Sequence, residues 1–382
     1  MSMNAVLSVQ SIIDEAVAIT GQDDFGSADW SEGLEVLVTA ARTEAKLNEA
    51  GEMSFRYRML NCATNRLQVI DWIKNHPEIK NEKIERPLMI IGLPRTGTTA
   101  LSNLLAADPD TRSLRVWESG SLIPPPTRAT YESDERIATA QAGLDLLIQM
   151  VPTFPSMYDD SATGTAEAID LLGMSFRAFQ LTGMAVMPSF DQWWLNCDMD
   201  EAYALHRQTL QLLQAACPPR RWHLKNPSDV FYLEAVRKTY PDAIFVWTHR
   251  DPAQVIPSVT NLIAELMDPF VTELDRPQLG RTQIALWAKG IERAQAFRAD
   301  NPEGFIDVAM TDLAADPLGT VARVYEAANW KFTNKSEVSM KQHLADTPRR
   351  GHKPDLDQYD FSLADIRNQF SSYCDQFSDF IN

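Results

Sequence analysis

The feature that most constrains the fold of this chain is a loop bounded by two glycines, residues 92–99, that directly follows a short apolar run. The run, residues 87–91, reads PLMII and does not alternate between apolar and polar residues, which is typical of a strand buried on both faces of a parallel sheet. Residues 98–107 are typical of a helix. The segment therefore predicts the strand–loop–helix unit of α/β proteins, whose sheets bind ligands at the carboxyl ends of their strands.

The loop is suited to holding a phosphate group. Gly92 and Gly97 let the backbone wrap closely around a ligand, and the helix that follows offers unpaired N–H groups and a partial positive charge. Thr99 adds a hydroxyl donor, as does Thr98. Nucleotide kinases carry lysine after the second glycine, but here Thr98 stands there and the cation, Arg95, lies inside the loop. Transfer of a γ-phosphoryl group is therefore disfavoured. The alternative to a phosphate-binding loop is an ordinary strand–helix turn in which the glycines occur by chance.

Strands and helices alternate along most of the remaining chain. Further strands are predicted at residues 111–116, 221–225, 243–248 and 305–308, and helices at 228–239, 252–266 and 285–301. The N-terminal part predicts helices alone, at 5–20, 33–50 and 54–75. We therefore expect an α/β fold with a mostly parallel central sheet and a helical N-terminal extension.

The segment PLMIIGLPRTGTTALSNLLAADPD, residues 87–110, resembles the 5′-phosphosulfate loop of sulfotransferases that use 3′-phosphoadenosine-5′-phosphosulfate (PAPS). It is most similar to a bacterial branch with arginine rather than lysine in the loop. The resemblance implies a P-loop-like three-layer α/β domain at 83–382. It does not extend to the helical extension expected at 1–82, nor to 119–200, which is expected to be either a helical cap over the acceptor site or irregular packing over the sheet. It also implies that PAPS contacts the loop residues Gly92, Pro94, Arg95, Thr96, Gly97, Thr98 and Thr99.

The resemblance assigns roles to four cations and a serine. In the family, the loop cation contacts the oxygen bridging sulfate and phosphate, so Arg95 is expected to stabilise the leaving phosphate. Family members bind the 3′-phosphate with an arginine and a serine at the spacing of Arg250 and Ser258. A basic C-terminal segment closes over the same phosphate, and Arg350 and Lys353 match it loosely. Without the resemblance, the segment at Arg250 is typical of a surface turn, and the segment with Arg350 and Lys353 is typical of a solvated basic loop.

Two residues are candidates for the general base that takes the acceptor proton. Glu118 follows the strand predicted at 111–116, where family members with a glutamate base place it; the alternative is an ion pair with Arg115 or another arginine. His223 is the second candidate, although a histidine inside a strand is more often a core residue. Lys225 alternates with His223 onto the same face and is expected to face the sulfate as a second cation.

The composition limits the other partners. A net charge of −17 argues against nucleic acids and polyanionic acceptors. The four cysteines show no zinc spacing and Thr248 stands where a magnesium carboxylate would end its strand, so no metal is expected. No apolar run reaches the roughly 18 residues of a membrane-spanning helix. The first residues do not resemble a secretory leader, and we expect a cytoplasmic protein.

Together these observations predict an enzyme that transfers a sulfuryl group from PAPS to a hydroxyl or amine of a small acceptor by in-line displacement. Apolar and aromatic residues in 119–200 suit an apolar alcohol, although they fill a core equally well. Two alternatives remain open at this stage. One is a small-molecule kinase of the P-loop type, and the other is a nucleotide-binding protein without catalytic activity.

Overall fold

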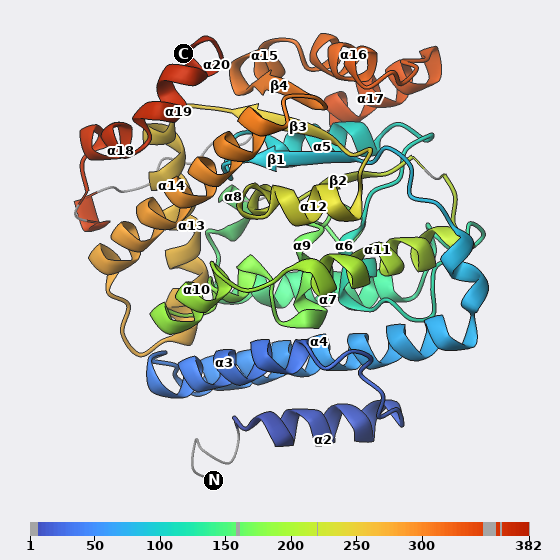
Figure 1. The fold of residues 1–382 in the computed structure, drawn as a ribbon, viewed down its shortest axis with the longest axis vertical. Helices are drawn as coiled ribbons and strands as arrows, with labels where there is room; N and C mark the ends of the chain where they lie inside the picture. The colour runs from blue at the N-terminus through green and yellow to red at the C-terminus, as the bar shows by residue number, and fades with distance from the viewer. Residues whose placement is uncertain (1–6, 158–160, 220, 347–356, 360, 382) are drawn as a thin grey trace.

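The computed structural model describes residues 7–157, 161–219, 221–346, 357–359 and 361–381. A four-stranded parallel sheet lies among many helices (Figure 1). Its strands follow the order β2-β1-β3-β4 and are β1 (Leu88–Gly92), β2 (His223–Lys225), β3 (Ile244–His249) and β4 (Phe305–Ala309). The strands predicted at 87–91, 221–225, 243–248 and 305–308 are thereby confirmed.

The sheet is covered on both faces because its strands are apolar on both faces. Leu88 and Ile90 of β1 pack with one set of helices, namely α5 (Thr98–Ala106), α16 (Pro317–Ala327) and α17 (Asn334–Asp346). Met89 and Ile91 face the larger core, which includes α12 (Leu233–Thr239), α13 (Pro252–Met267) and α14 (Arg276–Asp300). Helices, sheet and helices form three layers, as expected for the α/β domain (Figure 1).

The N-terminal residues form helices that lie at the end of the molecule remote from the sheet (Figure 1). They are α2 (Val9–Thr20), α3 (Trp30–Thr43), α4 (Glu49–Asn75) and the short 3-10 helix η1 (Pro77–Asn81). The predicted boundary between helices 33–50 and 54–75 was wrong, because the chain turns earlier. The side chain of Asn48 accepts a hydrogen bond from the Gly51 amide at 2.9 Å and so begins α4.

Short helices occupy the space between the sheet and α4 (Figure 1). They are α6 (Val116–Gly120), α7 (Arg136–Met150), α8 (Phe154–Met157), α9 (Ile169–Leu172), η2 (Gly173–Ser175), η3 (Phe179–Leu181), α10 (Pro188–Trp194) and α11 (Asp200–Ala215). Among the described residues, no helix is long and apolar enough to cross a membrane.

The strand predicted at 111–116 is absent. Its residues make only isolated bridges, from Arg112 to Trp222 and from Arg115 to Thr165, and α6 begins at Val116. The helix begins there because Glu118 caps it: the Glu118 carboxylate accepts a hydrogen bond from the Arg115 amide at 3.1 Å, and the Glu118 amide donates to the Arg115 carbonyl at 3.0 Å. Local capping therefore outweighs the apolar pattern that suggested a strand.

The chain after α14 completes the sheet and then returns to it. After β4 the chain forms α15 (Met310–Ala315), α16 and α17. Two short 3-10 helices lie earlier in the chain, η4 (Pro227–Phe231) after β2 and η5 (Asp268–Phe270) after α13. The last helices are η6 (Asp357–Tyr359), α18 (Leu363–Gln369), α19 (Ser371–Gln376) and α20 (Ser378–Ile381). They lie beside the carboxyl ends of β3 and β4, since Tyr373 bonds to His249 and α20 contacts β4.

Candidate active site

The loop after β1 lies beside the carboxyl end of β3, because Gly92 pairs with Thr248 in the parallel register. Gly92 has a φ of +128°, and a Cβ there would lie 2.6 Å from the Thr248 carbonyl oxygen. Gly97 has a φ of +90°, and its Cβ would lie 2.6 Å from the sulfur of Met310. Gly92 is therefore required by its backbone conformation and by the close approach of a backbone carbonyl, and Gly97 by its backbone conformation.

Arg95, Arg250 and Ser258 meet over this loop. The Nε atom of Arg95 donates to the Ser258 hydroxyl at 3.2 Å, and Nη1 of Arg250 donates to the Arg95 carbonyl at 3.1 Å. Two further N–H groups of Arg250 donate to the Gln254 amide oxygen at 3.1 and 3.2 Å. Arg250 forms no ion pair within the described part of the chain, and burial lowers its pKa. Two arginines from different loops that meet beside a glycine loop and a helix start make a site suited to an anion.

The backbone of Arg95 supports this arrangement. Arg95 has a φ of +65°, a left-handed conformation that non-glycine residues adopt infrequently. Such conformations cluster at ligand sites, where the surrounding contacts hold them. The contacts here are the hydrogen bonds from the Arg95 side chain to Ser258 and from Arg250 to its carbonyl.

The loop threonines have different surroundings. Thr96 is buried; its hydroxyl donates to the Leu93 carbonyl at 2.6 Å and lies 2.5 Å from the Thr248 hydroxyl, so it shapes the loop from inside. Thr98 is buried at the start of α5. Thr99 is half-buried and its hydroxyl accepts a hydrogen bond from Lys225 at 3.2 Å. Pro94 is half-buried in the loop.

Lys225 joins the same site from β2, whose register places it opposite Ile90. Its Nζ atom lies 3.5 Å from a carboxylate oxygen of Glu167, and its side chain is fully buried. Glu167 lies in an extended segment that pairs with β2: the Ala168 amide donates to the Lys225 carbonyl at 2.8 Å. The sequence analysis missed Glu167, because this residue belongs to no motif and its pairing with β2 joins residues far apart in the chain.

Glu118 is fully buried in a network of four hydrogen bonds. Arg112 donates to both carboxylate oxygens, at 2.6 and 3.2 Å, and the Arg115 amide and the Tyr131 hydroxyl each donate at 3.1 Å. Tyr131 also accepts a hydrogen bond from Arg112. This geometry supports the alternative in which Glu118 makes a structural ion pair with an arginine.

His223 is also fully buried. Its Nε2 atom lies 3.1 Å from the Ser102 carbonyl in α5, and burial lowers its pKa to about 4. His223 and Lys225 both contact α5, as their alternation predicted, but His223 lies one helical turn further from the loop, at Ser102 rather than Thr99. Arg350 and Lys353 lie outside the described residues.

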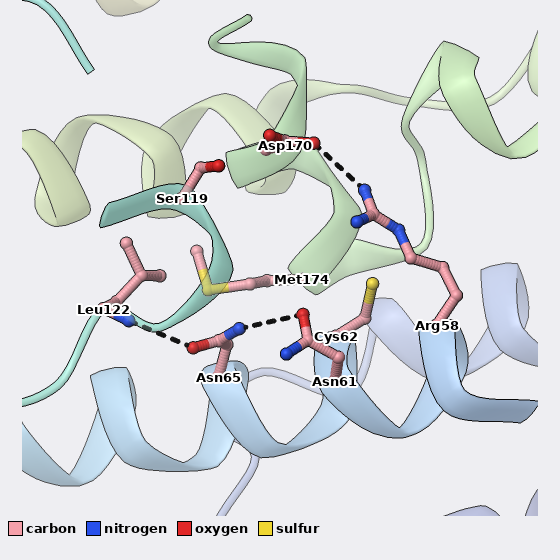
Figure 2. Close-up of a pocket in the computed structure, with 8 residues that line it drawn as sticks. All are labelled: Arg58, Asn61, Cys62, Asn65, Ser119, Leu122, Asp170 and Met174. Carbon is pink, nitrogen blue, oxygen red and sulfur yellow. Dashed lines mark hydrogen bonds and ion pairs between the residues drawn. The ribbon is translucent and has the colours of Figure 1, made fainter. Parts of the chain in front are cut away.

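A small polar pocket lies between α4 and the elements α6, α9 and η2 (Figure 2). It is lined by Arg58, Asn61, Cys62, Asn65, Ser119, Leu122, Asp170 and Met174. Arg58 donates to Asp170 at 3.0 Å, and the Leu122 amide donates to Asn65 at 3.3 Å. Asp170 lies three residues after Glu167, so the pocket adjoins the segment that carries this carboxylate. No cluster of three or more metal-ligating side chains occurs among the residues that the structure describes.

Comparisons with known proteins identify the family. The model of the sulfotransferase family matches residues 87–334. The crystal structure of sulfotransferase STF1 from Mycobacterium tuberculosis H37Rv is 31% identical, with a TM-score of 0.85 over 96% of this chain and 98% of that chain. Sulfotransferase STF9 from Mycobacterium avium is 29% identical, with a TM-score of 0.89 over 98% of this chain and 97% of that chain.

A curated relative resembles a shorter part of the chain. The omega-hydroxy-beta-dihydromenaquinone-9 sulfotransferase Stf3 of Mycobacterium bovis is 29% identical over 129 residues, which are 32% of each chain. The chain thus spans about a third of the length of the curated relatives that it matches. The matched segment of the family model contains both the loop at Gly92 and the Arg250–Ser258 pair, and the chain belongs to the sulfotransferase family, whose members are enzymes that transfer a sulfuryl group.

Proposed function

We propose that this enzyme binds PAPS across the carboxyl ends of β1 and β3 and transfers its sulfuryl group to a hydroxyl of a small apolar acceptor. The observation that supports the proposal most strongly is the meeting of Arg95, Arg250 and Ser258 around the glycine loop. The two arginines come from loops 155 residues apart: Arg95 donates to the Ser258 hydroxyl, and Arg250 donates to the Arg95 carbonyl and the Gln254 side chain. A ligand with two separate anionic groups fits such a site better than a single phosphate does.

Different residues of the site contact different groups of PAPS. The Gly92 loop and the start of α5 hold the 5′-phosphosulfate with backbone N–H groups. Arg250 and Ser258 hold the 3′-phosphate, for which a guanidinium is a bidentate partner. Arg95 stabilises the charge that develops on the leaving phosphate, and Lys225 does the same for the sulfate oxygens from the opposite side of the loop. No metal ligand is needed for this chemistry, because the cations belong to the chain itself.

Glu167 is the carboxylate that best fits the role of general base. It lies 3.5 Å from Lys225, and its side chain is 31% exposed, so an acceptor can reach it. Glu118 and His223 are fully buried and are held by other groups. An attacking hydroxyl beside Lys225 can therefore pass its proton to Glu167 as the sulfur–oxygen bond forms.

The acceptor lies on the side of the sheet that faces α4 and the segment 119–200. The mycobacterial relative acts on omega-hydroxy-beta-dihydromenaquinone-9, as its name states, and so on a hydroxyl of an apolar molecule. We extend only that chemical class to this chain. A cytoplasmic location remains part of the same proposal, since the synthesis and use of a nucleotide donor are compatible with it.

Calorimetric titration with adenosine 3′,5′-bisphosphate, followed by titration with ADP and Mg²⁺, tests the donor site. We expect tight binding of the bisphosphate and weak binding of ADP, because ADP lacks the 3′-phosphate that Arg250 would hold. The reverse order of affinities would contradict the proposal and favour a kinase. Radiolabelled sulfuryl transfer from PAPS to a panel of phenols and long-chain primary alcohols then identifies the acceptor class, and transfer to none of them would favour a binding protein without activity.

A further inference from the structure

The C-terminal helices contact His249 and Asp251, two residues at the end of β3 that are separated by one position. His249 is fully buried, and its ring stacks on Phe377 with centroids 4.3 Å apart. The hydroxyl of Tyr373, in α19, lies 2.9 Å from Nδ1 of His249. Arg367, in α18, donates to the Asp251 carboxylate at 2.6 Å. The residue between the two contacted ones is Arg250, the cation of the anion site.

The contacts at His249 form a directed chain of hydrogen bonds. Asp307 accepts from Arg298 at 2.6 and 2.7 Å and lies 2.8 Å from Nε2 of His249. Burial opposes the ionisation of Asp307, but the hydrogen bonds from Arg298 and His249 outweigh it and lower its pKa to about 2. An ionised carboxylate only accepts, so Nε2 of His249 carries the proton. Nδ1 is then an acceptor, and the Tyr373 hydroxyl donates to it.

Tyr373 is buried, which raises its pKa, so its hydroxyl keeps the proton that it donates to His249. Replacing Tyr373 with phenylalanine would leave the ring nitrogen of His249 without this partner.

The contact at Asp251 reaches α13, which carries Ser258. One carboxylate oxygen of Asp251 accepts from the Ala253 amide at 2.9 Å and caps the helix, while the other accepts from Arg367. The Arg367 side chain is 58% exposed and that of Asp251 is 12% exposed. Helices α18 and α19 thus support the backbone on both sides of Arg250 and the helix that holds Ser258.

We propose that Tyr373 and Arg367 are positioning residues for the 3′-phosphate of the donor. The Arg250 guanidinium and the Ser258 hydroxyl must keep their places beside Arg95 before an anion arrives. The hydrogen bonds to His249 and Asp251 fix the backbone on both sides of Arg250 and so preorganise the site for a ligand. This inference rests on the donor site described under the proposed function.

The test compares two ligands that differ by one phosphate, adenosine 3′,5′-bisphosphate and AMP. By calorimetry, Tyr373→Phe is expected to weaken binding of the bisphosphate by about five- to tenfold, the effect of losing one net hydrogen bond, with AMP binding changed less than about twofold. Arg367→Gln, whose side chain is exposed and therefore not needed for folding, is expected to weaken the bisphosphate by about two- to threefold. The selective effect distinguishes positioning from a general loss of structure.

Tyr240→Phe is the matched control, because the Tyr240 hydroxyl also contacts Nδ1 of a buried histidine, His206, at 2.6 Å. This variant should leave the ratio of the two affinities unchanged. If Tyr373→Phe weakens both ligands equally, or neither, the inference is wrong. If Tyr373→Phe does not fold, Arg367→Gln decides the question in the same way. If the unmodified protein itself does not prefer the bisphosphate to AMP, the proposed donor site is wrong, and this outcome is distinct from the others.

Discussion

At the scale of single residues, hydrogen bonds to neighbouring groups hold the two arginines of the site, Arg95 and Arg250. Arg95 occupies a left-handed conformation and binds Ser258 through its side chain, while its carbonyl binds Arg250. A cation in this position can bind the donor before the reaction, and it can also stabilise the negative charge that develops on the leaving phosphate during transfer.

Arg95→Ala is expected to lower the rate of PAPS turnover by about 100-fold or more and to change the affinity for adenosine 3′,5′-bisphosphate by less than about tenfold. The reason is that the contact with the leaving phosphate strengthens as the bond breaks. Steady-state kinetics with calorimetry separate the two effects. Arg323→Ala, at a side chain that is 57% exposed, is the control. Equal losses of rate and affinity would assign Arg95 to ground-state binding alone.

Two glutamates can be compared by the same substitution. Glu118→Gln leaves Arg112 as a buried charge without its partner and is expected to lower the free energy of unfolding by about 3–5 kcal/mol. Glu167→Gln removes the charged partner of the buried Lys225 but from a side chain that is 31% exposed, so it should lower this free energy by less, about 1–3 kcal/mol, and lower turnover by about 100-fold or more. Urea unfolding and kinetics on both variants provide the measurement. A stable Glu118→Gln protein without turnover would make Glu118 the base.

At the scale of elements, the N-terminal helices are tied to the α/β layers by close backbone contacts. At Gly51, near the start of α4, a Cβ would lie 1.9 Å from the carbonyl oxygen of Phe270 in η5. A side chain cannot be accommodated there unless the two elements move apart. The glycine therefore sets how closely α4 approaches the chain that follows α13.

Gly51→Ala is expected to lower the free energy of unfolding by about 1–3 kcal/mol, the usual cost of overpacking. Gly143→Ala, in α7, is the matched control, since a Cβ there meets nothing within 4 Å. That change should raise the free energy by about 0.5–1 kcal/mol, because alanine favours a helix over glycine. Thermal or urea unfolding checks both. An unchanged Gly51→Ala protein would mean that α4 can shift at little cost.

At the scale of the whole molecule, the chain is strongly acidic, with a net charge of −17, and its stability in acid depends on paired, partly buried carboxylates such as Asp307. The pKa of Asp307 is about 2 in the folded protein, below its ordinary value of 3.8. A lowered pKa means that the ionised form stabilises the fold above about pH 4 and that this contribution is lost as the pH falls toward 2.

Asp307→Asn should therefore lower the free energy of unfolding by about 2 kcal/mol at pH 6, and the difference from the unmodified protein should shrink between pH 4 and pH 2. Urea unfolding at a series of pH values measures it. Asp312→Asn, at a carboxylate that is 61% exposed, serves as the control. A difference that stays constant over this pH range would show that Asp307 acts through packing rather than through its charge.

Sequence alone was sufficient for the features that depend on neighbours along the chain. The apolar runs at 87–91 and 243–248 predicted buried parallel strands, and the structure confirms both, because a strand covered on both faces must be apolar on both. The glycines of the loop at 92–99 could also be identified, since their backbone conformations are local. The sulfotransferase family followed from the same segment and is confirmed by the comparisons.

Tertiary structure decided which charged groups meet. The pattern of residues 111–116 predicts a strand, but Glu118 caps a helix that begins at Val116. Arg112 then forms an ion pair with the Glu118 carboxylate. Glu167 belongs to no motif and reaches the site only because its segment pairs with β2 beside Lys225. Such contacts depend on which segments become neighbours in space, and the pattern of a single segment does not contain that information. The assignment of the donor phosphates to Arg95 and Arg250 remains a prediction, although the parallel register of β1 and β3 is what brings the two arginines together.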